Sequence, residues 1–270
     1  MVNKLMGVWI VLDTKFVALI MLLLSFGLFY FYMDRAKKGM KIKARTFPAV
    51  AAIPEAVGRA AEMGKPVYYS TGYGQATLNN QINGPQTLAG ISILGYVTRL
   101  CAKSGVKITY FTPIADSLPL VEETMRTAYM AEGKPEEFDP AIAINYQQEQ
   151  SPYLTASLGW IQREKPASTF LLGGFYYESV VIGEAGNTIG ALQIGGSANN
   201  HQLPFLVATC DYTLIMEELY AASAEISGNP DVLGSLKGED YLKFLFLALI
   251  AIGFVLALVN NTSLISFLKW

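Results

Sequence analysis

Two short polar stretches contain the residues whose types and spacing are best suited to bind a ligand. Each follows a run of apolar residues typical of a strand, and in open parallel sheets ligands bind beyond the carboxyl ends of the strands. Glycine there lets backbone amides approach an anion, and hydroxyl and amide side chains can hydrogen-bond to a polar ligand. The candidate ligand-binding residues are Thr71, Gly72 and Gly74 in the first stretch and Ser197, Asn199, Asn200 and His201 in the second.

Neither stretch matches a nucleotide-binding motif. Thr77 stands where the dinucleotide fingerprint requires its third glycine, and the G-K-[S/T] sequence of a phosphate-binding loop does not occur. A glycine-rich turn is therefore the simpler interpretation of the first stretch, and we predict no cofactor.

The sequence contains no recognisable catalytic or metal-binding set. His201 is the only histidine, and the pair Ser197 and His201 lacks the G-x-S-x-G context of a nucleophile elbow. A hydrolase or transferase would require these two side chains to meet an acid such as Asp211. The two cysteines, Cys101 and Cys210, are far apart and have no metal-ligand spacing. We therefore predict neither catalytic residues nor a metal site.

The acidic residues in the second half of the chain do not form a two-carboxylate site by spacing. Glu178 and Glu184 are six positions apart and do not share one face of a helix, and the adjacent Glu217 and Glu218 point in different directions. We interpret these acids as a solvated face or as local hydrogen-bond acceptors at helix termini.

Alternating strand-like and helix-like segments must position these residues. Apolar periodicity, proline near helix starts and glycine at helix ends define the segments. The predicted strands are 67–71, 106–111, 141–146, 168–172, 191–194 and 205–209, and the predicted helices are 53–63, 86–103, 117–131, 151–165, 176–185 and 212–226. Strands separated by helices indicate βαβ units. We predict that residues 46–240 form a soluble, Rossmann-like α/β domain with a mainly parallel sheet.

Two apolar segments near the ends of the chain predict membrane-spanning helices. Residues 16–33 carry no charge and would span about 27 Å as a helix, and residues 244–259 form a second uncharged run. The first run ends in aromatic residues and lysines rather than in a small-residue cleavage site, which favours an uncleaved anchor over a signal peptide. We predict anchors over 1–33 and 241–270, the latter with a short tail, and residues 1–15 either extend the first span or lie in the interface.

The distribution of basic residues predicts the orientation. Residues 34–45 carry six basic residues against one acid and form a basic juxtamembrane collar, and Lys237 and Lys243 precede the second apolar run. The positive-inside rule therefore predicts a multi-pass cell-membrane protein with a cytoplasmic α/β domain and short termini outside. The net charge of -2 gives no support for a nucleic acid partner.

Three segments of the chain, residues 45–67, 87–100 and 202–227, together resemble an uncharacterised prokaryotic family of membrane-anchored proteins that is known as a domain of unknown function. The resemblance covers most of residues 45–240. It implies a prokaryotic origin and a membrane location, and it assigns no catalytic residue.

These observations favour a non-catalytic integral membrane scaffold or complex subunit that presents its α/β domain for assembly. The expected partners are the lipid bilayer and either further copies of the chain or other membrane-complex subunits. The alternative is a membrane-tethered module that binds a small-molecule ligand, or acts as a sensor, through the two polar stretches. A membrane-tethered hydrolase is the least favoured hypothesis.

Overall fold

The chain divides into two compact units, Arg45–Ser227 and a second unit that combines Met1–Ala44 with Gly228–Trp270. The computed structural model describes residues 16–39, 47–74 and 77–258. The start of the predicted first anchor, much of the basic collar and the predicted short tail lie outside the described residues.

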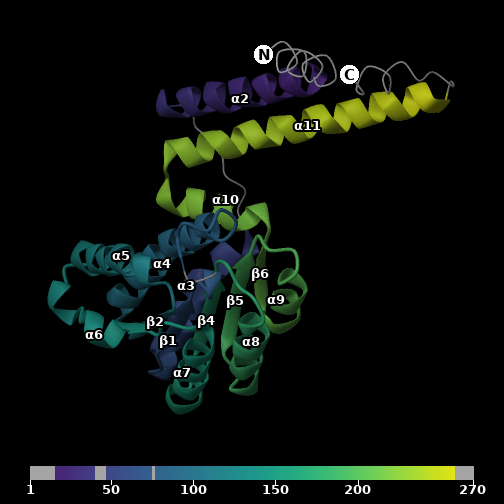
Figure 1. Ribbon diagram of the computed structural model, residues 1–270. Coiled ribbons are helices and arrows are strands. Elements are labelled where there is room, and N and C mark those ends of the chain that lie inside the picture. Colours follow the sequence, from purple (N-terminus) through teal and green to yellow (C-terminus); the bar gives the residue numbers. More distant parts are fainter. Residues whose placement is uncertain (1–15, 40–46, 75–76, 259–270) are drawn as a thin grey trace, which may run out of the picture. The chain divides into compact units, whose positions relative to one another are not determined.

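A six-stranded sheet, parallel throughout, forms the centre of the first unit, in the order β3-β2-β1-β4-β5-β6 (Figure 1). The strands are β1 (Val67–Ser70), β2 (Ile108–Thr112), β3 (Ile144–Tyr146), β4 (Ser168–Leu172), β5 (Leu192–Ser197) and β6 (Tyr212–Ile215). The predicted α/β class is confirmed. This is the doubly wound strand order, in which the direction of strand addition reverses between β1 and β4.

Helices cover both faces of the sheet. One face carries α3 (Pro48–Met63), α4 (Gly84–Ser104), α5 (Leu118–Ala131) and α10 (Glu217–Ser227), and the other carries α7 (Gln150–Glu164), α8 (Glu178–Thr188) and α9 (Leu203–Thr209). Successive strand side chains alternate between two cores, so Tyr69 packs in the first core and Tyr68 in the second. Because both faces are covered, the four central strands β1, β2, β4 and β5 are buried along their whole length.

Two predicted segments have the wrong type. Residues 205–209 form the helix α9 rather than a strand, because Pro204 starts the helix and Leu206 faces the core. The predicted helix 212–226 begins with the strand β6, whose Leu214 is buried, and Met216 with φ 54° turns the chain into α10. Short apolar runs do not distinguish strand from helix by periodicity, so tertiary pairing decides.

Two further boundaries are corrected. The predicted strand 141–146 starts with the helical turn α6 (Pro140–Ala143), because Asp139 accepts a hydrogen bond from the backbone N of Ala141 and caps it. The predicted strand 191–194 continues as β5 through Ser197, so the start of the second polar stretch pairs with β6 in the sheet.

The second unit contains two long helices, α2 (Phe16–Lys37) and α11 (Pro230–Leu258). Among the described residues, the segment Ala18–Lys37 is the one helix found to be long and apolar enough to cross a membrane, which supports a membrane association of the N-terminal segment. α11 is continuous across the predicted domain boundary at residue 240. A second span stays a prediction.

The two long helices pack closely against each other. Gly234 and Gly238 of α11 face α2, and a Cβ added at Gly234 would lie 2.6 Å from the Cα of Met33. The Nζ of Lys37 lies 2.8 Å from a carboxylate oxygen of Asp231. Gly234 and Gly238, which are one helical turn apart, allow the backbones of α2 and α11 to approach each other.

Candidate functional site

The loops that follow β1 and β4 meet at the point where the strand order reverses, which is where doubly wound folds bind ligands. The backbone N of Gly74 donates to the carbonyl of Gly174 at 2.8 Å. A Cβ on Gly72, whose φ is 78°, would lie 2.5 Å from that carbonyl oxygen, and a Cβ on Gly173 would lie 2.4 Å from the carbonyl oxygen of Thr71. The glycines therefore serve close packing of the two loops.

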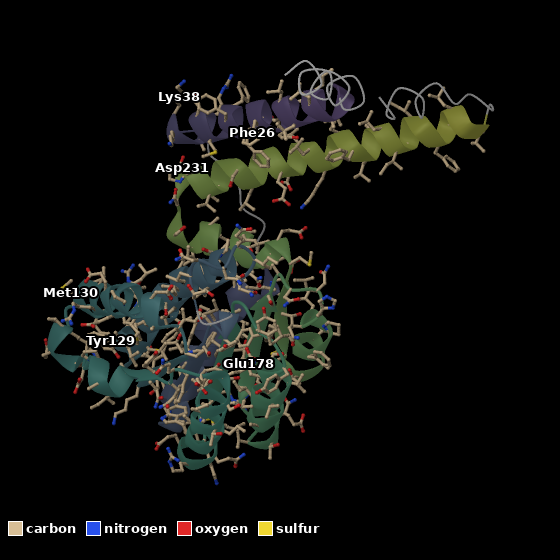
Figure 2. All side chains as sticks on the ribbon, in the orientation of Figure 1. Phe26, Lys38, Tyr129, Met130, Glu178 and Asp231 are labelled. Atoms are coloured by element: carbon tan, nitrogen blue, oxygen red, sulfur yellow. The ribbon has the colours of Figure 1, made fainter. Side chains whose placement is uncertain are left out.

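A buried carboxylate joins the same two loops. Glu178, the first residue of α8, is fully buried inside the α/β unit (Figure 2). Its Oε1 accepts hydrogen bonds from the backbone N of Tyr73 at 2.9 Å and of Tyr176 at 3.0 Å, and its Oε2 accepts one from Nε2 of Gln150 at 2.7 Å. The carboxylate thus satisfies two loop amides that are outside the sheet ladder.

A buried amide links α4 to the second polar stretch. Gln86, in the first turn of α4, accepts hydrogen bonds on Oε1 from Oγ of Ser197 at 2.9 Å and from the backbone N of Ala198 at 2.8 Å. Its Nε2 donates to the carbonyl of Ile82 at 3.1 Å. The Ser197 hydroxyl is fully buried and its proton points to Gln86, so it is not presented to a ligand.

The rest of the second stretch lies at the surface. Nδ2 of Asn199 donates to the carbonyl of Phe175 at 3.4 Å, and its Oδ1 accepts from the backbone N of His201 at 3.2 Å. The side chains of Asn200 and His201 are exposed. The structure therefore brings the first predicted stretch together with Ser197 and Asn199 through the β4 loop, and it leaves Asn200 and His201 at the rim.

Hydroxyl pairs fix the carboxyl ends of the strands. Oγ1 of Thr71 lies 2.6 Å from the hydroxyl of Tyr110, and Oγ of Ser70 lies 2.6 Å from the hydroxyl of Tyr153. Burial raises the pKa of Tyr110 and raises that of Tyr153 well above its usual value. Both phenols therefore stay protonated, and each pair holds the strand ends together by a hydrogen bond between two neutral hydroxyl groups.

The three residues that a hydrolase would need do not converge. Asp211 accepts a hydrogen bond from the backbone N of Gln193 at 2.7 Å, which places it near the amino end of β5. Ser197 stands at the other end of the same strand, four residues further on, or about 13 Å at the usual rise per residue. The described residues also contain no cluster of histidine, cysteine and acidic side chains that could hold a metal ion.

Basic residues are segregated away from this edge of the sheet. Every described lysine and arginine of the α/β unit lies in the C-terminal half of a helix or in the segment that leads to the amino end of a strand: Arg59, Lys65, Arg99, Lys103, Lys107, Arg126, Lys134, Arg163 and Lys165. Cations there complement the helix dipoles. The carboxyl edge consequently offers a phosphate no cationic side chain among its described residues.

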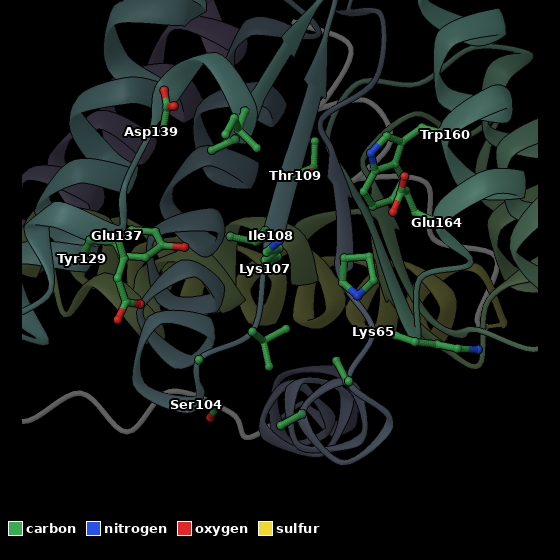
Figure 3. A pocket seen from close by; sticks show the side chains of 18 residues that line it. Lys65, Ser104, Lys107, Ile108, Thr109, Tyr129, Glu137, Asp139, Trp160 and Glu164 are labelled. Atoms are coloured by element: carbon green, nitrogen blue, oxygen red, sulfur yellow. The ribbon is translucent and has the colours of Figure 1, made fainter.

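A pocket of about 620 Å³ opens at the opposite edge, below the amino ends of β1 and β2 (Figure 3). Its charged and aromatic lining residues include Lys65, Lys107, Tyr129, Glu137, Trp160 and Glu164. The volume is in the range of small-molecule sites. Sequence reasoning did not find this pocket, because its walls come from five separated segments and no motif connects them.

Sequence reasoning also missed how the carboxyl edge is filled. It named Glu178 as part of a solvated face or as a helix-terminal acceptor, and it did not name Gln86 or Gln150 as site residues. The aromatic residues that precede Glu178 in sequence, Phe175, Tyr176 and Tyr177, were the available signal that its side chain is buried. A charged group is rarely buried without partners, so burial would in turn have predicted hydrogen-bond donors around it.

The comparisons with curated proteins and with solved structures found no match. A family model matches residues 8–268, which extends beyond the 45–240 expected from sequence and takes in both apolar segments. The chain therefore belongs to the family described as Domain of unknown function (DUF6754).

Proposed function

We propose that this protein is a non-catalytic membrane scaffold or complex subunit that presents its α/β domain for assembly. The observation that carries the proposal is the contact between the loops after β1 and β4, where glycine packing and the Glu178 carboxylate join the described loop residues at the usual ligand position. Loops that are joined in this way can present the carboxyl edge of the sheet as a surface for binding to other proteins.

In this proposal α2 and α11 both span the bilayer, with the α/β domain in the cytoplasm and short termini outside. Large apolar side chains on α2 and α11 support it, since residues such as Phe26, Phe244 and Phe254 are about two-thirds exposed. Basic residues near the end of α2, Arg35, Lys37 and Lys38, support the orientation.

Cysteine labelling tests the orientation. Lys103→Cys places an exposed thiol on the α/β domain. Asn261→Cys adds a thiol at a position that follows the second apolar segment in sequence. A membrane-impermeant maleimide added to intact cells should label the Asn261→Cys variant, and should label the Lys103→Cys variant only after lysis. Cys101 and Cys210 give a low background because burial raises the pKa of both thiols. Labelling of Lys103→Cys in intact cells would mean that the α/β domain lies outside the cell and would contradict the proposed orientation.

Assembly is tested on the full chain in its native membrane. Chemical cross-linking followed by detergent extraction and affinity purification should recover either multiples of the chain or a reproducible second membrane protein. Light scattering on the purified protein then gives the stoichiometry. A protein that is monomeric in detergent and cross-links to nothing would contradict the scaffold proposal.

The pocket at the amino ends of the strands favours a second candidate, a small-ligand-binding or sensor module. A ligand selective for the folded state raises the unfolding temperature, so a thermal-shift screen of metabolites tests it. Glu164→Gln changes an exposed pocket residue, and Asn200→Ala changes the rim of the opposite edge. A shift lost only in Glu164→Gln assigns the ligand to the pocket, and a shift lost only in Asn200→Ala assigns it to the predicted stretch. A screen without any shift contradicts the module.

A further inference from the structure

We propose that the loops after β1 and β4 form a carboxylate-binding site whose ligand is the chain's own Glu178 side chain. The inference goes beyond the scaffold proposal, because it concerns what is bound at the point where the strand order reverses. It applies equally to a monomer and to a complex.

The donors around Glu178 converge from three parts of the chain. Tyr73 belongs to the loop after β1, Tyr176 to the loop after β4, and Gln150 to the start of α7. A helix cap alone would account only for the contact with Tyr176, two residues before Glu178. The other two donors lie 105 and 28 residues away in sequence. The carboxylate therefore closes a site that the tertiary fold builds.

The site suits a singly charged carboxylate rather than a phosphate. Its donors are two backbone amides and one side-chain amide, which together supply the hydrogen bonds that a buried carboxylate needs. The described residues at this edge include no lysine or arginine to balance a second negative charge. Backbone amides directed at one anion resemble the anion-binding nests of other loops, with the anion supplied from within the chain.

Removal of the side chain should convert the internal ligand site into an empty one. Glu178→Ala leaves the part-buried amides of Tyr73 and Tyr176 without the acceptor that the fully buried Glu178 side chain supplies. Free acetate has the same acceptor group and fits the volume that the deleted carboxymethyl portion leaves. The variant should therefore bind acetate, and the wild-type protein should not.

The experiment is thermal unfolding of the full chain in detergent, at about pH 7.5 so that carboxylates are ionised. Sodium acetate, sodium chloride and sodium phosphate are compared at equal ionic strength. The unfolding temperature of Glu178→Ala should start below that of wild type and rise with acetate to a plateau, but not with chloride or phosphate. Glu178→Gln, whose side chain fills the site, and Glu184→Ala, which removes an exposed charge from the same helix, should show no acetate-specific rise.

Equal effects of acetate on Glu178→Ala and Glu184→Ala would overturn the proposal, and so would a phosphate response as large as the acetate response. If Glu178→Ala does not fold, hydrogen exchange on the wild-type chain decides. The amides of Tyr73 and Tyr176 lie outside helices and strands, yet the proposal requires them to exchange as slowly as the β1 amides. Fast exchange at both would overturn it. Neither measurement depends on membrane topology or assembly, so its failure is separate from a failure of the scaffold function.

Discussion

Thr98 offers a test in which the loss of a hydrogen-bonding group should stabilise the protein. Thr98 lies on α4 and is fully buried, and its Oγ1 has no hydrogen-bond partner in the described structure. Valine has the same shape with a methyl group in place of the hydroxyl. Thr98→Val should therefore remove an unsatisfied polar group without creating a cavity.

The magnitude follows from the cost of burying a hydroxyl without a partner, which is about 1–3 kcal/mol from protein mutational data. Threonine and valine have similar helix propensities, so that contribution is small. We expect Thr98→Val to raise the free energy of unfolding by about 1 kcal/mol, which corresponds to about 2–4 °C in the unfolding temperature for a domain of this size.

Thr169→Val is the matched control. Thr169 is equally buried, but its Oγ1 donates to Oε1 of Gln193 at 2.9 Å. The same substitution there should lower the free energy of unfolding by about 1–2 kcal/mol, because it leaves the Gln193 acceptor without its donor. Urea and thermal unfolding of both variants provide the comparison. If Thr98→Val destabilised the protein as much as Thr169→Val, the Thr98 hydroxyl would have a partner and the reasoning would be refuted.

Three further predictions concern the loops, the long helices and a cysteine. Gly72→Ala should lower the unfolding temperature for two reasons: a φ of 78° costs an L-residue about 1 kcal/mol or more, and the added Cβ would meet the Gly174 carbonyl. An unchanged unfolding temperature would mean that the loops after β1 and β4 are not in contact. Gly234→Leu should separate α2 from α11, because its Cβ position is already 2.6 Å from the Met33 backbone; proteolysis of both helices in detergent should accelerate, whereas Ser235→Ala should have little effect. Cys210 is half-buried, and desolvation raises the pKa of its thiol to about 12 from a usual value near 9. The thiol should therefore react with a disulfide reagent at pH 8 roughly a thousandfold more slowly in the folded than in the unfolded chain. Equal rates would contradict the raised pKa.

Local sequence determined the class of the fold and most of its elements. The strands 67–71 and 168–172 and the helices between strands were predictable because both faces of a parallel sheet are buried, which leaves continuous apolar runs separated by periodic helices. Proline and glycine fixed several limits, as Gly105 does with φ 68° after α4. The apolar run 16–33, which overlaps the helical segment Ala18–Lys37, was equally predictable, since composition alone distinguishes it.

Only the tertiary structure decided what fills the candidate site. Thr71, Gly72 and Gly74 were placed correctly at the end of a strand, but Tyr73 and Glu178 meet because β1 and β4 are neighbours in the sheet although 97 residues intervene between Ser70 and Ser168. The same applies to β6, whose short apolar run becomes a strand because β5 offers it a pairing edge. Local periodicity records which side of an element is buried, and it contains no information on which distant backbone amides a buried carboxylate will meet.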